Sequence, residues 1–195
     1  MACGRGRHAI YMNKKGHHVY GYDLAEESIV FANEFKNPRL HFEVRDMREN
    51  LGESRFDWVF NLFTSFGYFE NREDDIIALK SIARSLKPGG RLLIDFMNAE
   101  KVAKRLVPKE HKKAGGIDFY IERYTRGNLI IKEIKFTADG KEWCFEEKVQ
   151  LLTKDDFEEF INLAGLKLVE HFGSLDLQPF NHLSSDRLII LAQKT

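Results

Sequence analysis

Short apolar runs alternate with amphipathic helical segments through the first half of this 195-residue sequence. The alternation predicts strands that lie parallel in one sheet, because each helix carries the chain back to the same end of the sheet. Since the helices then cover both faces, we expect an α/β sandwich of three layers with a mostly parallel sheet. The expected helices are Arg7–Lys15, Glu26–Phe35, Glu73–Leu86 and Asp155–Ala164, and the expected strands are His17–Tyr22, Leu40–Val44, Phe56–Leu62, Arg91–Phe96, Leu166–Phe172 and Arg187–Ala192.

The pattern changes between residues 99 and 152, where helical periodicity gives way to two-residue alternation. Asp139-Gly140 within this segment is a strong hairpin signal. We therefore expect one domain over residues 1–195 with a small antiparallel β insertion at 99–152. The strands expected in it are Asp118–Thr125, Asn128–Thr137 and Glu142–Leu152. Six cations precede them, which form either a solvated helix face or an attractant for an anionic substrate: Lys101, Lys104, Arg105, Lys109, Lys112 and Lys113.

The charges balance, with 30 Lys and Arg against 30 Asp and Glu, so no general affinity for nucleic acid is indicated. No run of 18 apolar residues predicts a membrane span. The isolated cysteines Cys3 and Cys144, together with the lack of an apolar leader, favour a reducing compartment, and we expect a cytoplasmic protein. No His, Cys, Asp or Glu cluster has metal-ligand spacing, so no metal is expected.

The first chemical motif is Ala2-Cys3-Gly4-Arg5-Gly6, which leads directly into the first expected helix. Two glycines let the backbone approach a ligand closely, and the helix N-terminus offers unpaired N–H groups to an anion. A tight turn with no ligand would also explain this loop. The small size of Cys3 explains its place there better than thiol chemistry does.

Two acids follow at the tips of successive strands. Asp23 lies 17 residues after Gly6, where an acid can accept hydrogen bonds from both ribose hydroxyls of a nucleoside cofactor. Asp46 is placed to accept the exocyclic amine of adenine, and Met47 to pack on the ring. The alternatives are a solvated acid for Asp23 and a helix N-cap for Asp46.

A segment of aromatic and hydroxyl residues, 61–69, follows the strand that ends near Leu62. Open α/β sheets bind ligands at the carboxyl ends of their strands, so this segment suits a cofactor wall and a substrate floor. The alternative is that Phe63, Phe66 and Phe69 belong to the core.

Together these motifs resemble the class I S-adenosylmethionine-dependent methyltransferases over nearly the whole chain. The resembling segments are ACGRGRHA, VYGYDLAEES, RDM, FDWVFNLFTSFGYF, LKPGGRLLIDFMN and SSDRLIILAQK. The resemblance implies a Rossmann-like seven-stranded sheet whose last strand is antiparallel, and methyl transfer from S-adenosylmethionine to a small-molecule acceptor, with S-adenosylhomocysteine as product. It also implies that residues 99–152 form a lid.

The resemblance assigns the cofactor site residue by residue. The Gly4 and Gly6 loop would hold the methionine end, Asp23 the ribose, and Asp46 with Met47 the adenine. The cofactor-binding set is Ala2, Cys3, Gly4, Arg5, Gly6, Asp23, Leu24, Asp46, Met47, Asn61 and Leu62. Methyl transfer needs mainly positioning, so no catalytic residue is obligatory; Tyr68, His182 and Tyr11 are candidates for substrate contact.

The sequence departs from the family pattern at its start, since the family has a strand before the glycine loop, usually ending in an acid. We therefore expect an N-terminal truncation, with a marginally stable fold unless a partner supplies the strand. Two other functions stay open. The spacing Gly4-x-Gly6-x-x-Ala9 also fits an NAD(P)-dependent dehydrogenase, and a strand-less chain fits a catalytically silent cofactor-binding domain. The sequence leaves the oligomeric state open.

Overall fold

The computed structural model describes all residues from Met1 to Thr195. Its first part contains α1 (Arg7–Lys14), β1 (Val19–Asp23), α2 (Glu26–Ala32), the 3-10 helix η1 (Asn33–Phe35) and β2 (Leu40–Val44). The middle contains β3 (Phe56–Asn61), α3 (Arg72–Ser85), β4 (Leu86–Met97) and α4 (Ala99–Lys104). The remaining elements are β5 (Lys109–Ala114), β6 (Ile117–Arg126), β7 (Leu129–Ala138), β8 (Lys141–Gln150), α5 (Lys154–Leu163), β9 (Leu166–Phe172) and β10 (Arg187–Lys194).

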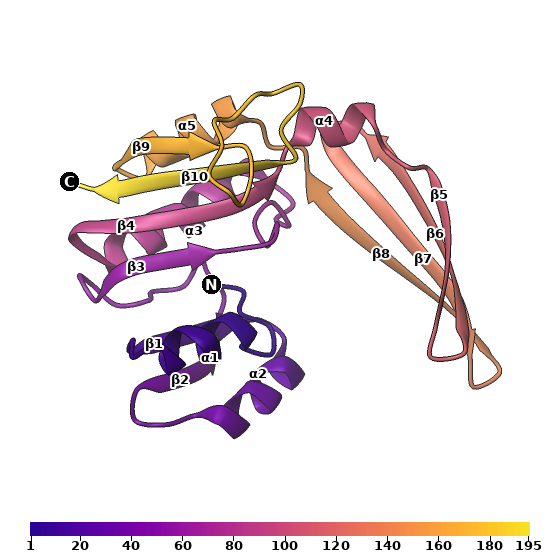
Figure 1. Cartoon of the computed structure of the whole chain (residues 1–195), viewed down its shortest axis with the longest axis horizontal. Helices are drawn as coiled ribbons and strands as arrows, with labels where there is room; N and C mark the ends of the chain where they lie inside the picture. Colours follow the sequence, from indigo (N-terminus) through magenta and orange to yellow (C-terminus); the bar gives the residue numbers. More distant parts are fainter.

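The strands form three sheets instead of one mostly parallel sheet with an insertion. β1 and β2 pair in parallel as a two-stranded sheet, and a four-stranded sheet has the order β3-β4-β10-β9. Only β3 and β4 are parallel neighbours in the second sheet, because the last strand, β10, runs antiparallel to both β4 and β9. The expectation of one mostly parallel sheet with an antiparallel last strand is therefore met only in part. The parallel pairs and the antiparallel last strand are present, but β1 and β3 lie opposite each other without pairing, so the strands belong to separate sheets (Figure 1).

Two apolar cores correspond to the two α/β sheets. The larger comprises 20 buried residues, mostly from α3, α5 and the four-stranded sheet. The smaller has five buried residues, contributed by α1, α2 and β2: Ala9, Ile29, Ala32, Leu40 and Phe42. Tyr22 of β1 packs into the larger core, so the two parts remain in contact.

The Lys87-Pro88-Gly89-Gly90 stretch does end a helix, but it lies inside β4 and does not precede a separate strand. The pairing of β4 with β3 shifts register here, between Phe56 and Trp58. A Cβ on Gly90 would lie 2.8 Å from the Lys87 carbonyl oxygen, so only glycine fits this bulge.

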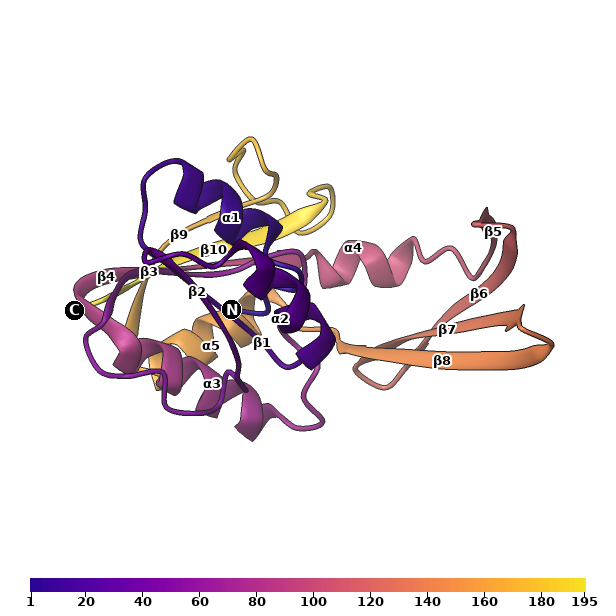
Figure 2. The same cartoon turned by 90° about the horizontal axis from the view of Figure 1, so that it is seen from below.

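The four antiparallel strands β5 to β8, residues 109–150, form a projecting sheet that extends away from the rest of the molecule (Figures 1 and 2). Three strands were expected here, and the structure has four. β5 was missed because its sequence, Lys109–Ala114, is polar, and only backbone pairing with β6 makes it a strand. Its lysines suit an edge strand, since charge discourages pairing with other chains.

Side chains cap the N-termini of α3, α4 and α5 but not those of α1 and α2. The Asn71 side chain accepts a hydrogen bond from Asp74 N–H at the start of α3, and Thr153 and Asp156 form a capping box at the start of α5. None of the helices combines the length and the apolar character that a membrane crossing requires.

Candidate functional site

Backbone N–H groups of the glycine loop fix it to the end of β1, where Cys3 N–H donates to the Tyr22 carbonyl over 2.9 Å. Gly4 N–H donates to Asp23 Oδ2 over 2.6 Å, and Gly6 N–H donates to the Cys3 carbonyl over 3.0 Å. Gly6 has φ of +81°, and a Cβ there would lie 2.7 Å from the Phe42 ring. Only glycine fits at this position. No side chain caps α1, whose first N–H groups are free to bind an anion.

Asp23 uses part of its hydrogen-bonding capacity to shape this loop. Its Oδ1 accepts from Ala25 N–H over 2.9 Å, while its Oδ2 accepts from Gly4. An ionised carboxylate has about four acceptor positions, so acceptor positions remain for ligand hydroxyls. The side chain of the next residue, Leu24, is exposed beside it.

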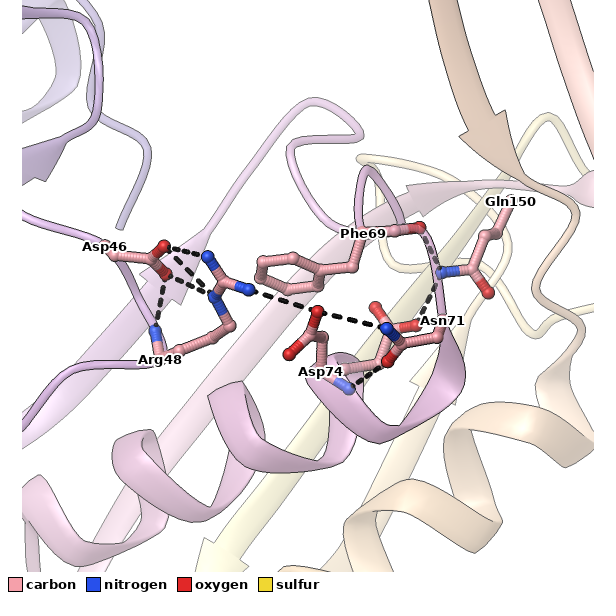
Figure 3. A network of polar contacts seen from close by, with 7 residues as sticks. Asp46, Arg48, Phe69, Asn71, Asp74 and Gln150 are labelled. Atoms are coloured by element: carbon pink, nitrogen blue, oxygen red, sulfur yellow. Dashed lines mark hydrogen bonds and ion pairs between the residues drawn. The ribbon is translucent and has the colours of Figure 1, made fainter.

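Asp46 is already held by a neighbouring cation (Figure 3). Its carboxylate accepts from the Arg48 side chain, over 3.0 Å from Nε and 2.5 Å from Nη2, and from Arg48 N–H over 2.9 Å. This ion pair, more than any other cause, lowers the pKa of Asp46. The residue caps no helix, so the N-cap alternative is wrong. Met47 packs against the larger core.

The Arg48 side chain also contacts α3 and so links Asp46 to that helix. Its Nη1 lies 3.1 Å from Asp74 Oδ2, and its guanidinium lies 5.0 Å from the centroid of the Phe69 ring. The carbonyl of Phe69 in turn accepts from Gln150 Nε2 over 3.0 Å. The network in Figure 3 therefore runs from the tip of β2 to the last residue of the projecting sheet.

Gln150 also donates to Asp75 Oδ2 over 2.6 Å, in the buried space between β8 and α3. Burial is the main cause that raises the pKa of Asp75 to about 6, against a smaller opposing effect of this hydrogen bond. Asp75 Oδ1 and the single side-chain oxygen of Gln150, Oε1, have no hydrogen-bond partner.

Asn61, the last residue of β3, has the strongest unmet requirement for polar partners near the site. The side chain is 0% exposed, and neither its Nδ2 nor its Oδ1 has a hydrogen-bond partner. Because a buried amide without partners is costly, these atoms fit a polar ligand at the carboxyl end of the strand. A core position was the alternative for three phenylalanines: Phe66 is fully buried and Phe69 packs against the larger core, whereas Phe63 is half exposed.

A cavity of about 760 Å³ joins the glycine loop to the space between β1 and β3. Of the expected cofactor residues, it brings together Ala2, Cys3, Gly4, Arg5 and Leu62. The others lie outside its lining. Its walls also include the facing sides of β1 and β3, so the cavity is larger than the loop alone would form.

The three candidate substrate-contact residues are not brought together. Tyr68 is 54% exposed beside the projecting sheet, and burial, more than nearby Glu147, raises its pKa. Tyr11 is exposed on α1, where Lys15 lies over its ring. His182 is exposed in the loop before β10, and only its carbonyl is engaged, by Asn98 Nδ2.

Cys3 has a pKa raised to about 11, mainly by burial, so its thiol stays protonated. This agrees with a packing role. No group of three or more His, Cys, Asp or Glu side chains is arranged to hold a metal ion.

Sequence reasoning missed four polar residues near the site: Arg48, Asp95, Gln150 and Arg187. Asp95 and Arg187 form an ion pair with Oδ1 2.7 Å from Nε, although they are 92 positions apart. The sequence offered one signal for this pair: Asp95 stands within the apolar run of β4, and an acid buried there needs a partner.

Comparison with known proteins gives one matching family model, described as a methyltransferase domain, over residues 1–90. A Bacillus subtilis protein named "Putative methyltransferase YqeM" is 37% identical, and the match covers 100% of this chain and 83% of that protein. A dTDP-3-amino-3,4,6-trideoxy-alpha-D-glucopyranose N,N-dimethyltransferase of Streptomyces venezuelae is 27% identical over 86% of this chain and 74% of that protein.

Two solved structures share the fold at low identity. An S-adenosylmethionine-dependent methyltransferase from Clostridium acetobutylicum superposes with a TM-score of 0.86 at 21% identity, covering 99% of this chain and 81% of that one. CalS10 of Micromonospora echinaspora, an amino pentose methyltransferase solved with S-adenosylmethionine bound, gives a TM-score of 0.74 at 21% identity, covering 100% and 81%.

Proposed function

This chain belongs to the class I S-adenosylmethionine-dependent methyltransferases, and from that premise we propose how its residues bind the cofactor and present the acceptor. When bound, S-adenosylmethionine would supply a sulfonium methyl group: the acceptor nucleophile bonds to the methyl carbon in line as the C–S bond breaks, and the electron pair of that bond stays on the sulfur of the departing S-adenosylhomocysteine. The protein contributes positioning and the exclusion of water.

The glycine loop and the start of α1 hold the methionine end of the cofactor. The uncapped N–H groups of α1 face an anionic carboxylate favourably, because the helix dipole is positive at this end. Ala2, Cys3 and Arg5 line the same cavity. The observation that carries the proposal is the hydrogen bond from Gly4 to Asp23, since it fixes the loop against the acid that receives the ribose.

Asp23 accepts hydrogen bonds from the ribose hydroxyls through its unused acceptor positions, with Leu24 beside it. Asp46 receives the adenine amine, for which one of its contacts with Arg48 must be released, and Met47 lies along the ring. Asn61 and Leu62 complete the wall at the end of β3. The unpartnered amide of Asn61 gains its missing partners from the cofactor.

The projecting sheet acts as a lid over the acceptor. It is joined to the site loop at its base, where Gln150 N–H donates to the Gly67 carbonyl over 2.8 Å. Tyr68, the next residue of that loop, is the substrate-contact candidate best placed to meet an acceptor under this sheet. Tyr11 and His182 remain weaker candidates.

The acceptor is a small molecule, and the two aminosugar methyltransferases named above support an amine within that class. We place the protein in the cytoplasm, acting on neither nucleic acid nor membrane. The balanced charge supports this, because binding to a polyanion usually needs a basic excess.

Isothermal titration of S-adenosylhomocysteine into wild type and Asp23→Ala tests the binding site. The substitution removes a charged acceptor of two hydroxyls and should weaken binding by about 1.5–3 kcal/mol. Glu27→Ala, which removes an exposed acid from the first turn of α2, is the matched control and should bind like wild type.

Equal affinity of Asp23→Ala and wild type would remove Asp23 from the site. Titration with NAD in place of S-adenosylhomocysteine tests the dehydrogenase alternative, which a tighter complex with NAD would favour. Binding without transfer to any amine, hydroxyl or carbon acceptor would favour a silent binding domain.

A further inference from the structure

The loop that leaves β3 has an unusual backbone. Phe63 has φ of +60° and Thr64 has φ of +57°, two consecutive residues in the left-handed region that favours glycine. The left-handed conformation is especially unfavourable for a β-branched residue such as Thr64. Because strained backbone persists only where its surroundings enforce it, and often marks a functional site, this loop needs a reason for lacking glycine here.

A buried ion pair holds the strained backbone in place. Asp95 on β4 is 2% exposed; its Oδ2 accepts from Phe63 N–H and its carbonyl accepts from Thr64 N–H, each over 2.9 Å. Arg187 on β10 donates from Nε to Asp95 Oδ1 over 2.7 Å and from Nη2 to Thr64 Oγ1 over 3.1 Å. Side-chain and backbone groups of β4 and β10, two strands remote in sequence, therefore hold both residues in the left-handed conformation.

The strained conformation directs one side chain onto α1. The Phe63 ring stacks on the His8 ring, with centroids 5.1 Å apart, and the Arg7 guanidinium lies 4.8 Å from the Phe63 centroid. Arg7 and His8 form the first turn of α1, directly after the glycine loop. All three side chains line the cavity that holds this loop. A glycine at position 63 would relieve the strain but would leave this side of the cavity open.

We propose that Asp95 and Arg187 are positioning residues, which hold the strained turn so that the Phe63 ring closes the cofactor cavity against the first turn of α1. The proposal rests on the proposed function, because it assigns the glycine-loop end of the cavity to S-adenosylmethionine. A buried ion pair suits such a role, since its gain is in fixed geometry more than in stability. Two parallel donors of a planar guanidinium reach the acid and the hydroxyl together, which a lysine cannot do.

The test first asks whether the pair positions Phe63, without using the cofactor. The ring-proton NMR signals of His8 report the stacked Phe63 ring, and Phe63→Ala gives their unstacked position. Arg187→Gln and Thr64→Gly should move the His8 signals most of the way to that position, and Arg187→Lys part of the way. If Arg187→Gln leaves the His8 signals unchanged while the protein stays folded, the positioning role is overturned.

The second measurement asks what the closed ring does for the cofactor. Phe63→Ala, Thr64→Gly and Arg187→Gln should each weaken S-adenosylhomocysteine binding about tenfold, although Thr64→Gly raises the melting temperature by relieving strain. Ser54→Gly is the matched control, because Ser54 also has positive φ, +46°, but lies away from the cavity lining. It should raise the melting temperature and leave binding unchanged.

The outcomes separate this proposal from the proposed function. If wild type binds no S-adenosylhomocysteine, the proposed function fails, and with it the cofactor role of Phe63, while the His8 signals still decide whether Arg187 positions the ring. If wild type binds and the three variants bind equally well despite unstacked His8 signals, only the cofactor role of Phe63 is overturned.

Discussion

Two parts of this molecule contribute residues to the proposed cofactor site but differ in how they are stabilised. The N-terminal unit (α1, β1, α2 and β2) has one two-stranded sheet and a core of five buried residues. The C-terminal unit (β3, α3, β4, α5, β9 and β10) has a four-stranded sheet and most of the 20-residue core. The glycine loop and Asp23 belong to the first unit, and Asn61 to the second.

The proposed binding surface therefore lies across two units that differ in stability, a less stable N-terminal unit and a more stable C-terminal unit. Side chains make contacts across the division, such as the edge-on packing of the Tyr20 ring of β1 against the Phe56 ring of β3, with centroids 5.7 Å apart. Two-stranded sheets with small cores are marginal in isolation. A ligand that touches both units should therefore stabilise the N-terminal unit more than the C-terminal one, by mass action.

Removing one buried aromatic ring from each unit should give the largest effects. Phe157 packs against Phe66 and Phe96 in the larger core, and Phe157→Ala should destabilise the whole protein by about 3–5 kcal/mol. Phe42→Ala should instead unfold the N-terminal unit alone. Amide hydrogen exchange measures both, with the exposed Phe35→Ala as control. Loss of protection throughout the chain in Phe42→Ala would mean that the units fold as one.

Filling the space between β1 and β3 with a strand should remove much of the difference in stability between the two units. A strand of five alternating Val and Ile residues, fused ahead of Met1, has the edges of both strands to pair with, since β1 and β3 each pair with one strand only. The fusion would also turn the buried Met1 amine into a neutral amide. This removes the cost of burying an ammonium group, whose pKa burial already lowers.

We expect this fusion to stabilise the protein by about 2–4 kcal/mol, after the ordering entropy of five residues is subtracted from up to ten hydrogen bonds. Thermal unfolding followed by circular dichroism measures it. A fusion with proline at alternate positions is the control, because proline cannot donate to either edge. Equal melting temperatures for the two fusions would show that the space accepts no strand.

The C-terminal unit should show a pH response at Asp75 that the N-terminal unit lacks. Burial raises its pKa to about 6, so the folded state binds this proton more tightly than the unfolded state does. Its contribution to stability is complete below the unfolded pKa of 3.8 and is lost as the pH rises through 6. Asp75→Asn should abolish this loss and raise the free energy of unfolding by about 1–2 kcal/mol at pH 8.

Urea unfolding at pH 5 and pH 8 measures that gain. Glu73→Gln, which changes an exposed acid in the first turn of α3, is the control and should not change the pH dependence in the same direction. The assignment would be lost if Asp75→Asn and wild type kept the same difference in unfolding free energy between the two pH values.

The smallest effect should come from the Arg48 bridge between the tip of β2 and α3. Both its ion pairs are partly exposed, so Arg48→Gln should cost only about 0.5–1 kcal/mol. The pKa of Asp46, which Arg48 lowers, should rise in the variant. Stability from this pair is present above the unfolded pKa and lost as the pH falls through the lower folded value. Carboxyl NMR titration measures the shift; an unchanged Asp46 titration would contradict the assignment.

Local pattern was sufficient to find most elements and the glycine loop. Periodicity predicted α3 and α5, and Asp139-Gly140 marks the β7–β8 turn, with φ of +52° and +71°. It failed at β5, whose polar sequence carries no strand signal, and at Lys87–Gly90, where a bulge keeps β4 continuous.

The sequence by itself determined the order of strands and helices outside the projecting sheet, the glycines that the loop requires, and the acids at two strand tips, because each depends on residues close together in the chain. The sequence also indicated that a strand before the glycine loop is missing, and β1 and β3 indeed do not pair. Only the tertiary structure decided that Arg48 binds Asp46 and that Asp95 meets Arg187 across 92 positions. Those features depend on which strand edges and side chains meet in space, and no local period or spacing encodes such a meeting.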